Sequence, residues 1–341
     1  MSQAWLEQRE RGSVLGVRLI VGIAFFLGRT VARLVLYPVC LYFLLFSVNS
    51  RRASRKYLSR ALGRQVRVAD LFRHYFTFAT VALDRFFLLK DRSDLFDIRI
   101  HGEQVLQQTL DRGQGCLLLG AHLGSFEVLR AAGTANRIDV RMVMYEDNAR
   151  MVNAIAKAVN PALPDRIIAL GRFDSMFKVH ERLLESAWVG ILGDRTLEDG
   201  DQLQASFLGE AALFPAAPYR MALMLKRPIV FMTGLYRGGN RYELYFEQLF
   251  DPEGVGRSAR ATAVETALQH YAQRLEHYCR DAPFNWFNFY EFWDAGASKP
   301  AGSREVALGT YAAQVLDPDS DESRMAAEHA LRPADRTLTG K

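Results

Sequence analysis

A histidine and a glutamate five residues apart are placed where they could carry out acid–base chemistry. The segment from Gly120 to Glu127 reads GAHLGSFE and ends a short apolar run, CLLLG. In a continuous helix, residues five apart point about 140° away from each other, so His122 and Glu127 would not meet. If His122 instead precedes the helix, its ring can fold back over the first turn and reach Glu127. The sequence therefore predicts a histidine–glutamate dyad at a strand–turn–helix junction.

This dyad suits the attack of a hydroxyl group on an activated carbonyl. A neutral imidazole takes the hydroxyl proton, while the carboxylate fixes its tautomer and stabilises the imidazolium that forms. We expect the backbone N–H groups of Gly124 and Ser125 to point into the same space and to hold a developing oxyanion. Taken alone, a His-x4-Glu match is weak evidence. The alternative is a histidine that caps a helix beside an unrelated glutamate.

The elements that must position the dyad follow from the spacing of apolar residues. Short apolar runs alternate with segments of helical periodicity along the body of the chain. Such alternation is typical of an α/β fold with a mixed, mainly parallel sheet flanked by helices. We expect buried strands at 116–119, 140–144, 167–170, 188–192 and 228–235, and a strand with one wet face at 241–248. We expect helices at 68–90, 125–136, 149–159, 174–187, 216–226 and 259–280.

The N-terminal region contains two apolar runs, 19–28 and 34–50, separated by Arg29 and Arg33. The second run has seventeen residues and no charge, which is at the short edge of what spans a bilayer about 30 Å thick. We interpret this region as a retained membrane anchor, because no small-residue cleavage site follows the first run. A buried helical hairpin is the alternative. Whether the anchor spans once, spans twice or lies in one leaflet stays open, and Pro38 would kink any single helix through the second run.

The charge of the chain is unevenly distributed. Residues 1–67 hold twelve Arg and Lys against two Glu, a net of +10, so the remainder carries −5 within the total of +5. Basic clusters beside apolar segments stay on the cytoplasmic side and attract anionic headgroups. We therefore expect membrane lipids, and not nucleic acid, as partners. The expected location is the inner (cytoplasmic) membrane, with the catalytic part facing the cytoplasm.

Several functional classes lack their motifs in this chain. There is no GxGxxG after a strand, no P-loop, no HExxH and no GxSxG, which disfavours nucleotide binding, zinc proteolysis and α/β-hydrolase chemistry. The three cysteines are scattered, which argues against a disulfide framework and fits a reducing compartment. His270 and His277 lie seven residues apart with no third ligand evident. No metal site is expected.

The HLGSFE motif, the N-terminal anchor and the order of the downstream motifs resemble the late lipid A acyltransferases of the glycerolipid acyltransferase superfamily. The resemblance covers roughly residues 1–295 and implies that fold, with His122 as general base assisted by Glu127. It implies no cofactor, an acyl chain taken from acyl carrier protein or coenzyme A, and a lipid or glycolipid hydroxyl as acceptor. The blocks that match the family downstream contain Asp194, Arg195, Phe207, Gly209, Phe214 and Pro215, and these residues, with Gly124 and Ser125, are the expected substrate-binding residues.

Two further features bear on the acceptor. Asn148 and Arg150, which follow the strand expected at 140–144, are weaker candidates for contact with polar or phosphate groups. The segment 283–293 reads PFNWFNFYEFW and lacks the His and Arg that lipid A enzymes commonly carry there. A less cationic pocket would hold a doubly phosphorylated disaccharide less well. In this respect the chain resembles relatives that accompany aryl polyene lipid assembly.

The resulting interpretation divides the chain into a membrane anchor with a basic segment at 1–67, an acyltransferase domain at 68–295 and a mobile tail at 296–341. Two other hypotheses stay open at this point. Water could replace the acceptor on the same dyad, which would make the protein an acyl thioesterase or lipid hydrolase. Alternatively, the protein could be a non-enzymatic membrane lipid-binding protein.

Overall fold

The computed structural model describes residues 14–113, 115–135, 139–145, 159–160, 166–170, 174–195 and 200–293. Asn148, Arg150, almost all of the helix expected at 149–159 and the tail expected from residue 296 lie outside these described residues.

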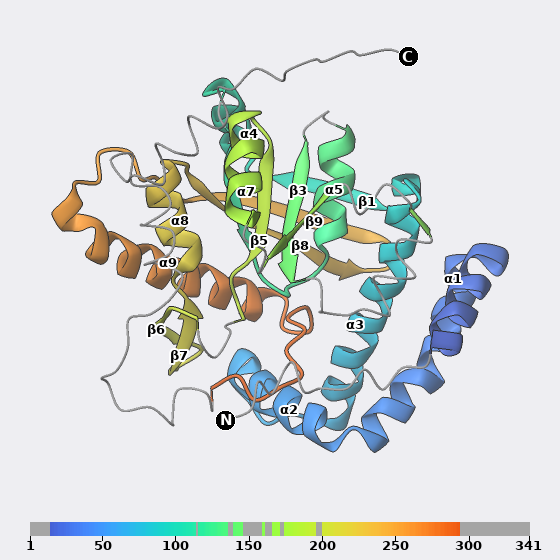
Figure 1. The fold of residues 1–341 in the computed structure, drawn as a ribbon. Helices are drawn as coiled ribbons and strands as arrows, with labels where there is room; N and C mark the ends of the chain where they lie inside the picture. The colour runs from blue at the N-terminus through green and yellow to red at the C-terminus, as the bar shows by residue number, and fades with distance from the viewer. Residues whose placement is uncertain are drawn as a thin grey trace, which may run out of the picture.

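A seven-stranded sheet forms the centre of the molecule, with strand order β1-β9-β8-β2-β5-β3-β4 (Figure 1). Strands β8, β2, β5, β3 and β4 run parallel, while β9 is antiparallel to β8 and pairs in parallel with β1. The strands are β1 (Asp97–His101), β2 (Leu117–Gly120), β3 (Val140–Tyr145), β4 (Ile167–Leu170), β5 (Trp188–Leu192), β8 (Ile229–Gly238) and β9 (Arg241–Phe250). The predicted α/β class with a mixed, mainly parallel sheet is confirmed.

Helices cover both faces of the sheet because side chains alternate between the faces along each strand. In β2, Leu117 and Leu119 belong to the core cluster that includes Tyr271 of α9, whereas Leu118 packs in a second cluster with residues of α4 and α5. The helices around the sheet are α4 (Glu103–Asp111), α5 (Phe126–Ala135), α7 (Ser175–Leu184), α8 (Ala217–Leu225) and α9 (Arg260–Asp281).

Most of the expected elements are present within one to three residues of their expected ends. The structure adds an antiparallel hairpin, β6 (Gln202–Phe207) and β7 (Glu210–Pro215), which the apolar spacing did not indicate. Strand β1 and helix α4 were also not expected.

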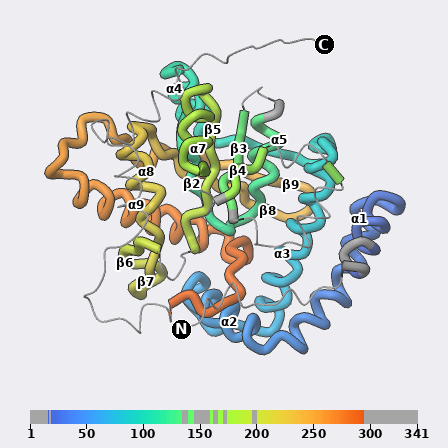
Figure 2. The backbone as a smooth tube through the Cα atoms, viewed as in Figure 1, coloured from blue at the N-terminus to red at the C-terminus, as the bar shows by residue number. Residues whose placement is uncertain are grey.

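The N-terminal region forms three helices, α1 (Val14–Phe46), α2 (Val48–Leu62) and α3 (Val68–Leu89). The two apolar runs are joined in α1, which is kinked at Gly28 (φ 86°, ψ 166°), so they do not form a hairpin. Figure 2 shows α1, in blue, on the outer side of α3 and continuing into α2. By length and composition, Leu19–Phe46 is the one helix among the described residues that could cross a membrane.

Candidate active site

His122 and Asp194 meet at one edge of the sheet. His122 follows β2 and Asp194 follows β5, and these neighbouring strands are parallel, with Gly120 opposite Leu192. Because the carboxyl ends of parallel strands share an edge, the two side chains come together there. His122 Nδ1 lies 2.8 Å from Asp194 Oδ1, and the backbone N–H of His122 donates to Asp194 Oδ2 at 3.0 Å.

A third donor completes the environment of this carboxylate. The indole Nε1–H of Trp286 donates to Asp194 Oδ2 at 2.9 Å. Burial disfavours the charged carboxylate, but His122, Arg195 and Trp286 outweigh it and lower the pKa of Asp194 to about 2. The side chain of Asp194 is only 3% exposed. Asp194 is therefore a buried, ionised acceptor for the imidazole.

The protonation state of the His122 imidazole follows from the same surroundings. Burial and the positive charge of Arg195 lower its pKa from the usual value, against the opposing effect of Asp194. The ring is therefore neutral at pH 7, with its proton on Nδ1, where the carboxylate accepts it. The side chain is 29% exposed. A neutral Nε2 on a partly exposed imidazole can take a proton from a substrate hydroxyl.

Trp286 lies on the segment Pro283 to Trp293, here called the aromatic strap, which also holds the backbone around His122. The N–H of Phe287 donates to the carbonyl of His122 at 2.8 Å, and the N–H of Gly124 donates to the carbonyl of Asn285 at 2.9 Å. Leu123 and Trp286 form an antiparallel bridge. The strap therefore fixes both the histidine turn and the carboxylate that the histidine contacts.

The other side of the strap rests on α2 and α3, as Figure 2 shows. His74 of α3 is fully buried, and its Nε2 lies 2.8 Å from the carbonyl oxygen of Trp286. Its Nδ1 lies 2.7 Å from the Ser54 hydroxyl of α2. Burial lowers the pKa of His74 to about 4, so the ring is neutral at pH 7. Hydrogen bonds of His74 and of Trp286 thus connect α2 and α3 to the carboxylate that His122 contacts.

The amides expected to form an oxyanion hole are engaged elsewhere. The N–H of Ser125 donates to the carbonyl of Gly234 at 2.8 Å, and that of Gly124 donates to the strap. Gly124 has φ +72°, and a Cβ there would lie 2.0 Å from the Gly234 carbonyl oxygen. The Ser125 N–H thus holds the histidine turn against β8 and the Gly124 N–H holds it against the strap, so neither amide is free in this structure, and substrate contact by Gly124 and Ser125 stays a prediction.

Glu127 lies in the first turn of α5, and its ion-pair partner is Arg85 of α3, with 2.7 Å between Nε and Oε1. No hydrogen bond or ion pair joins Glu127 to His122 among the described contacts. The carboxylate bonded to His122 is instead Asp194, which the sequence had assigned to substrate binding. The dyad of His122 and Glu127 stays a prediction.

A model of the bacterial lipid A biosynthesis acyltransferase family matches residues 5–294, well over half of the chain. The chain belongs to this family. The resemblance drawn from the HLGSFE motif is thereby confirmed, and the protein is an acyltransferase that acts on lipid. The comparison with curated proteins returned no match.

The remaining expected substrate-binding residues of this acyltransferase lie in and beside the hairpin. Phe207 and Phe214 are fully buried, and Phe207 contacts Trp286 with ring centroids 5.3 Å apart. Gly209 (φ +83°) lies in the two-residue turn between β6 and β7, and Pro215 ends β7. Phe207 and Phe214 thus pack against rings of the strap, and contact of Phe207, Gly209, Phe214 and Pro215 with substrate stays a prediction.

Arg195 directly follows Asp194, and its guanidinium lies over the ring of Tyr290 in the strap, 5.7 Å from the centroid. The Arg195 guanidinium thus places a positive charge near His122 in this acyltransferase. Substrate binding by Arg195 stays a prediction. The tight cluster of His122, Asp194 and Trp286 was only partly visible in the sequence, because Trp286 is 92 residues away from Asp194.

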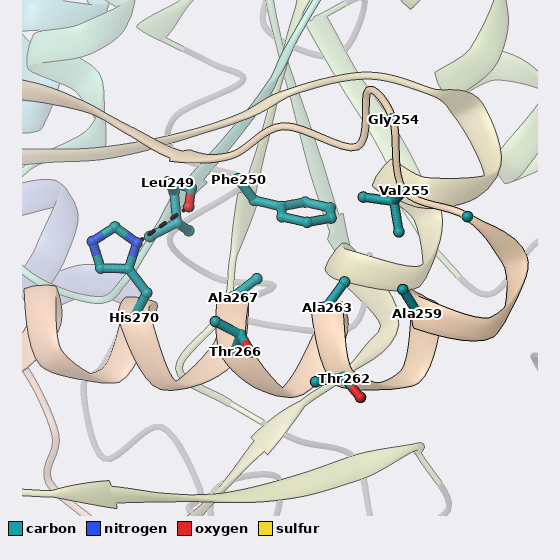
Figure 3. Close-up of a pocket in the computed structure, with 11 residues that line it drawn as sticks. Leu249, Phe250, Gly254, Val255, Ala259, Thr262, Ala263, Thr266, Ala267 and His270 are labelled. Carbon is teal, nitrogen blue, oxygen red and sulfur yellow. Dashed lines mark hydrogen bonds between the residues drawn. The ribbon is translucent and has the colours of Figure 1, made fainter.

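A separate apolar groove of about 470 Å³ lies between the end of β9, the following loop and the first half of α9 (Figure 3). His270 lines it, and its Nδ1 lies 3.2 Å from the carbonyl oxygen of Leu249. None of the lining residues belongs to the cluster around His122. Among the described residues, no group of His, Cys, Asp or Glu side chains could hold a metal ion.

Proposed function

We propose that the protein transfers a fatty acyl chain from an acyl thioester to a hydroxyl group of a lipid or glycolipid, with His122 as the general base. The observation that carries this proposal is the 2.8 Å contact between His122 Nδ1 and the buried carboxylate of Asp194. It leaves Nε2 unprotonated, on a side chain that is partly exposed.

In the proposed reaction the acceptor hydroxyl oxygen attacks the thioester carbonyl carbon while His122 Nε2 takes the hydroxyl proton. Asp194 accepts the Nδ1–H bond throughout and stabilises the imidazolium that forms. The tetrahedral intermediate then expels the thiolate, which takes the proton back from Nε2. An ester and a free thiol are the products, so no protein nucleophile and no cofactor are needed.

In this proposal Asp194 has the role of orienting His122, which the sequence analysis expected of Glu127. Glu127, in the first turn of α5, forms an ion pair with Arg85, and a direct part for Glu127 in catalysis stays a prediction. Arg195 is the proposed cationic contact for polar or phosphate groups of the substrates, because its charge already acts on His122.

The substrates are proposed by chemical class. The donor is acyl carrier protein or coenzyme A carrying a fatty acyl chain, and the acceptor is a lipid A precursor or a related lipid such as an aryl polyene lipid. The proposed location is the cytoplasmic face of the inner membrane. The family, the apolar helix α1 and the basic N-terminal region support this location.

The test uses purified full-length protein in mild detergent, a radiolabelled acyl chain carried as a thioester on acyl carrier protein or coenzyme A, and total lipid from the host membrane. Wild type is compared with His122→Ala, Asp194→Asn and Glu127→Gln. We expect His122→Ala and Asp194→Asn to lower turnover about 10²–10⁴-fold. Mass analysis of the labelled lipid product identifies the acceptor.

The matched control is His277→Ala, because His277 is exposed on α9 and should keep full activity. Near-normal transfer by His122→Ala would overturn the proposal. Labelled free fatty acid as the only product would support the hydrolase hypothesis instead. A loss in Glu127→Gln with none in Asp194→Asn would return the orienting role to Glu127.

A further inference from the structure

The second arm of α1, which follows the kink at Gly28, has one face that no other part of the described structure covers. The large residues on this face are Leu34, Leu41 and Leu45, and each is between 49% and 63% exposed. At 100° per residue they fall on one side of the helix, and no charged residue lies among them. An uncovered apolar face of about three turns marks a surface for contact with an apolar phase.

The opposite face of the same arm is firmly attached to the protein. Ala32, Leu36, Cys40 and Leu44 recur every four residues and are at most 5% exposed. Arg29 also points inward, where Nε and Nη2 donate to the buried carboxylate of Asp84 at 2.6 and 2.7 Å. Arg29 and Arg33, the charged residues of this arm, are thus bonded to the protein, while the outward face is apolar, the reverse of a helix that faces water.

The course of α1 relative to α3 decides how it can meet a membrane. Phe25 contacts Phe87 with ring centroids 5.5 Å apart, and Tyr37 contacts Phe72 at 5.9 Å, so the two helices run antiparallel over most of the length of α3. If α1 crossed a bilayer, α3 would have to enter it as well. Asp84 and the neighbouring Arg85 would then lie at bilayer depth, where charged groups are costly and rare.

A cationic surface adjoins the apolar face. Arg52 and Arg55 of α2 are exposed, and Nη1 of Arg51 donates to the carbonyl of Leu45 at the end of α1 at 3.0 Å. Tyr37 and Tyr42, both about half exposed, have the ring and hydroxyl that are enriched at the interface between acyl chains and headgroups. From the apolar face to α2, the surface therefore presents apolar, then aromatic, then basic residues. These match the acyl chains, the interface and the headgroups of an anionic leaflet.

We propose that α1 lies in the plane of a single leaflet, with its outward face among the acyl chains and Arg52 and Arg55 at anionic headgroups, and that it does not cross the bilayer. This inference deepens the proposed membrane location and rests on it. The partner is a lipid surface that contains anionic headgroups. The catalytic domain would then sit beside the leaflet that holds its acceptor.

Depth measurements on the full-length protein in vesicles of phosphatidylcholine and phosphatidylglycerol test this proposal. Spin labels are placed on the outward face in the single variants Leu34→Cys, Leu41→Cys and Leu45→Cys. The native cysteines are buried, and the labelling of unmodified protein gives the background. Lys178→Cys, on α7, is the control for a label that is exposed to water.

An in-plane helix puts all three labels at the same shallow depth, within a few ångströms. In a crossing helix, positions 34 and 45 differ in depth by about 16 Å, since each residue rises 1.5 Å, and that result would overturn the proposal. Labels that stay in water would also overturn it. Spin–spin coupling between labels on different molecules would also overturn the proposal, because a second copy of the chain, and not lipid, would then cover the face.

A binding measurement tests the cationic part separately. We expect Arg52→Gln/Arg55→Gln to weaken binding to vesicles with anionic lipid about 25-fold and to leave binding to neutral vesicles unchanged. Equal binding to both vesicle types by wild type and variant would contradict the role of these arginines. Transfer in detergent does not depend on either result, so failure here is distinguishable from failure of the proposed reaction.

Discussion

The buried charge of Asp194 depends on three donors from two parts of the chain: the Nδ1–H and the backbone N–H of His122, and the indole N–H of Trp286 in the strap. If one donor is removed, the carboxylate can rotate or take up a proton, and the imidazole loses its orientation. Single-atom changes at this point are therefore informative.

Trp286→Phe removes the indole N–H but keeps a ring against Tyr57 and Phe207. A hydrogen bond to a charged group contributes about 1.5–3 kcal/mol, so we expect kcat to fall about 10–100-fold while the KM for the acceptor changes little. Steady-state kinetics measures both. The control is Trp293→Phe, which loses an indole bond to the Phe207 carbonyl and leaves Asp194 untouched. Equal losses in the two variants would show a general packing effect.

Arg195→Gln tests the electrostatic surroundings of His122 through pH. The positive charge of Arg195 lowers the pKa of His122, so its removal raises that pKa. The imidazole then stays protonated, and inactive as a base, up to a higher pH. We expect the acid limb of the profile of kcat/KM against pH to move to higher pH in Arg195→Gln and to stay in place in Arg195→Lys. An unmoved limb in Arg195→Gln would contradict this account.

At the scale of elements, backbone hydrogen bonds hold the histidine turn between β8 and the strap. Gly124 of the turn and Gly234 of β8 permit the two backbones to approach closely. Gly124→Ala places a Cβ against the Gly234 carbonyl at a positive φ, so we expect a loss of about 3 kcal/mol or more in the free energy of unfolding. Gly209→Ala has a similar positive φ but open space around it, and should cost only about 1–2 kcal/mol. Urea unfolding compares the two, and equal losses would argue against the close contact.

The strands that carry the site were predictable because they are continuous apolar runs, and Asp194 was singled out because it follows one of them. Its role was not predictable, since a carboxylate at a strand end looks the same whether it contacts substrate or a histidine. Strand β1 was missed because its side chains alternate between exposed and half-buried at the sheet edge. The β6–β7 turn was missed because Leu208 and Gly209 form it without the Asn-Gly pair that marks such turns.

At the scale of the whole molecule, the ion pair between Arg29 and Asp84 joins α1 to α3. Tyr242 of β9 also donates to Asp84, at 2.7 Å. Arg29→Met leaves the carboxylate buried without its cation, and we expect it to lower the free energy of unfolding by about 3–5 kcal/mol. Chemical unfolding in mild detergent measures this change.

The double variant Arg29→Met/Asp84→Leu removes both charges, and we expect it to recover most of the loss because a paired burial is replaced by an apolar one. A double variant as unstable as Arg29→Met would indicate that packing around Arg29, and not the unpaired charge, is responsible. This prediction therefore rests on the difference in stability between the single variant in α1 and the double variant in α1 and α3.

The position of the strap along the chain has a consequence for biosynthesis. Helix α1 is among the first described elements to leave the ribosome, whereas Trp286 is among the last. Helix α1 can therefore fold while Asp194 still lacks its indole donor and Gly124 its carbonyl acceptor. We expect the nascent protein to have no acyltransferase activity until synthesis is nearly complete, which protects acyl thioesters from an unfinished enzyme.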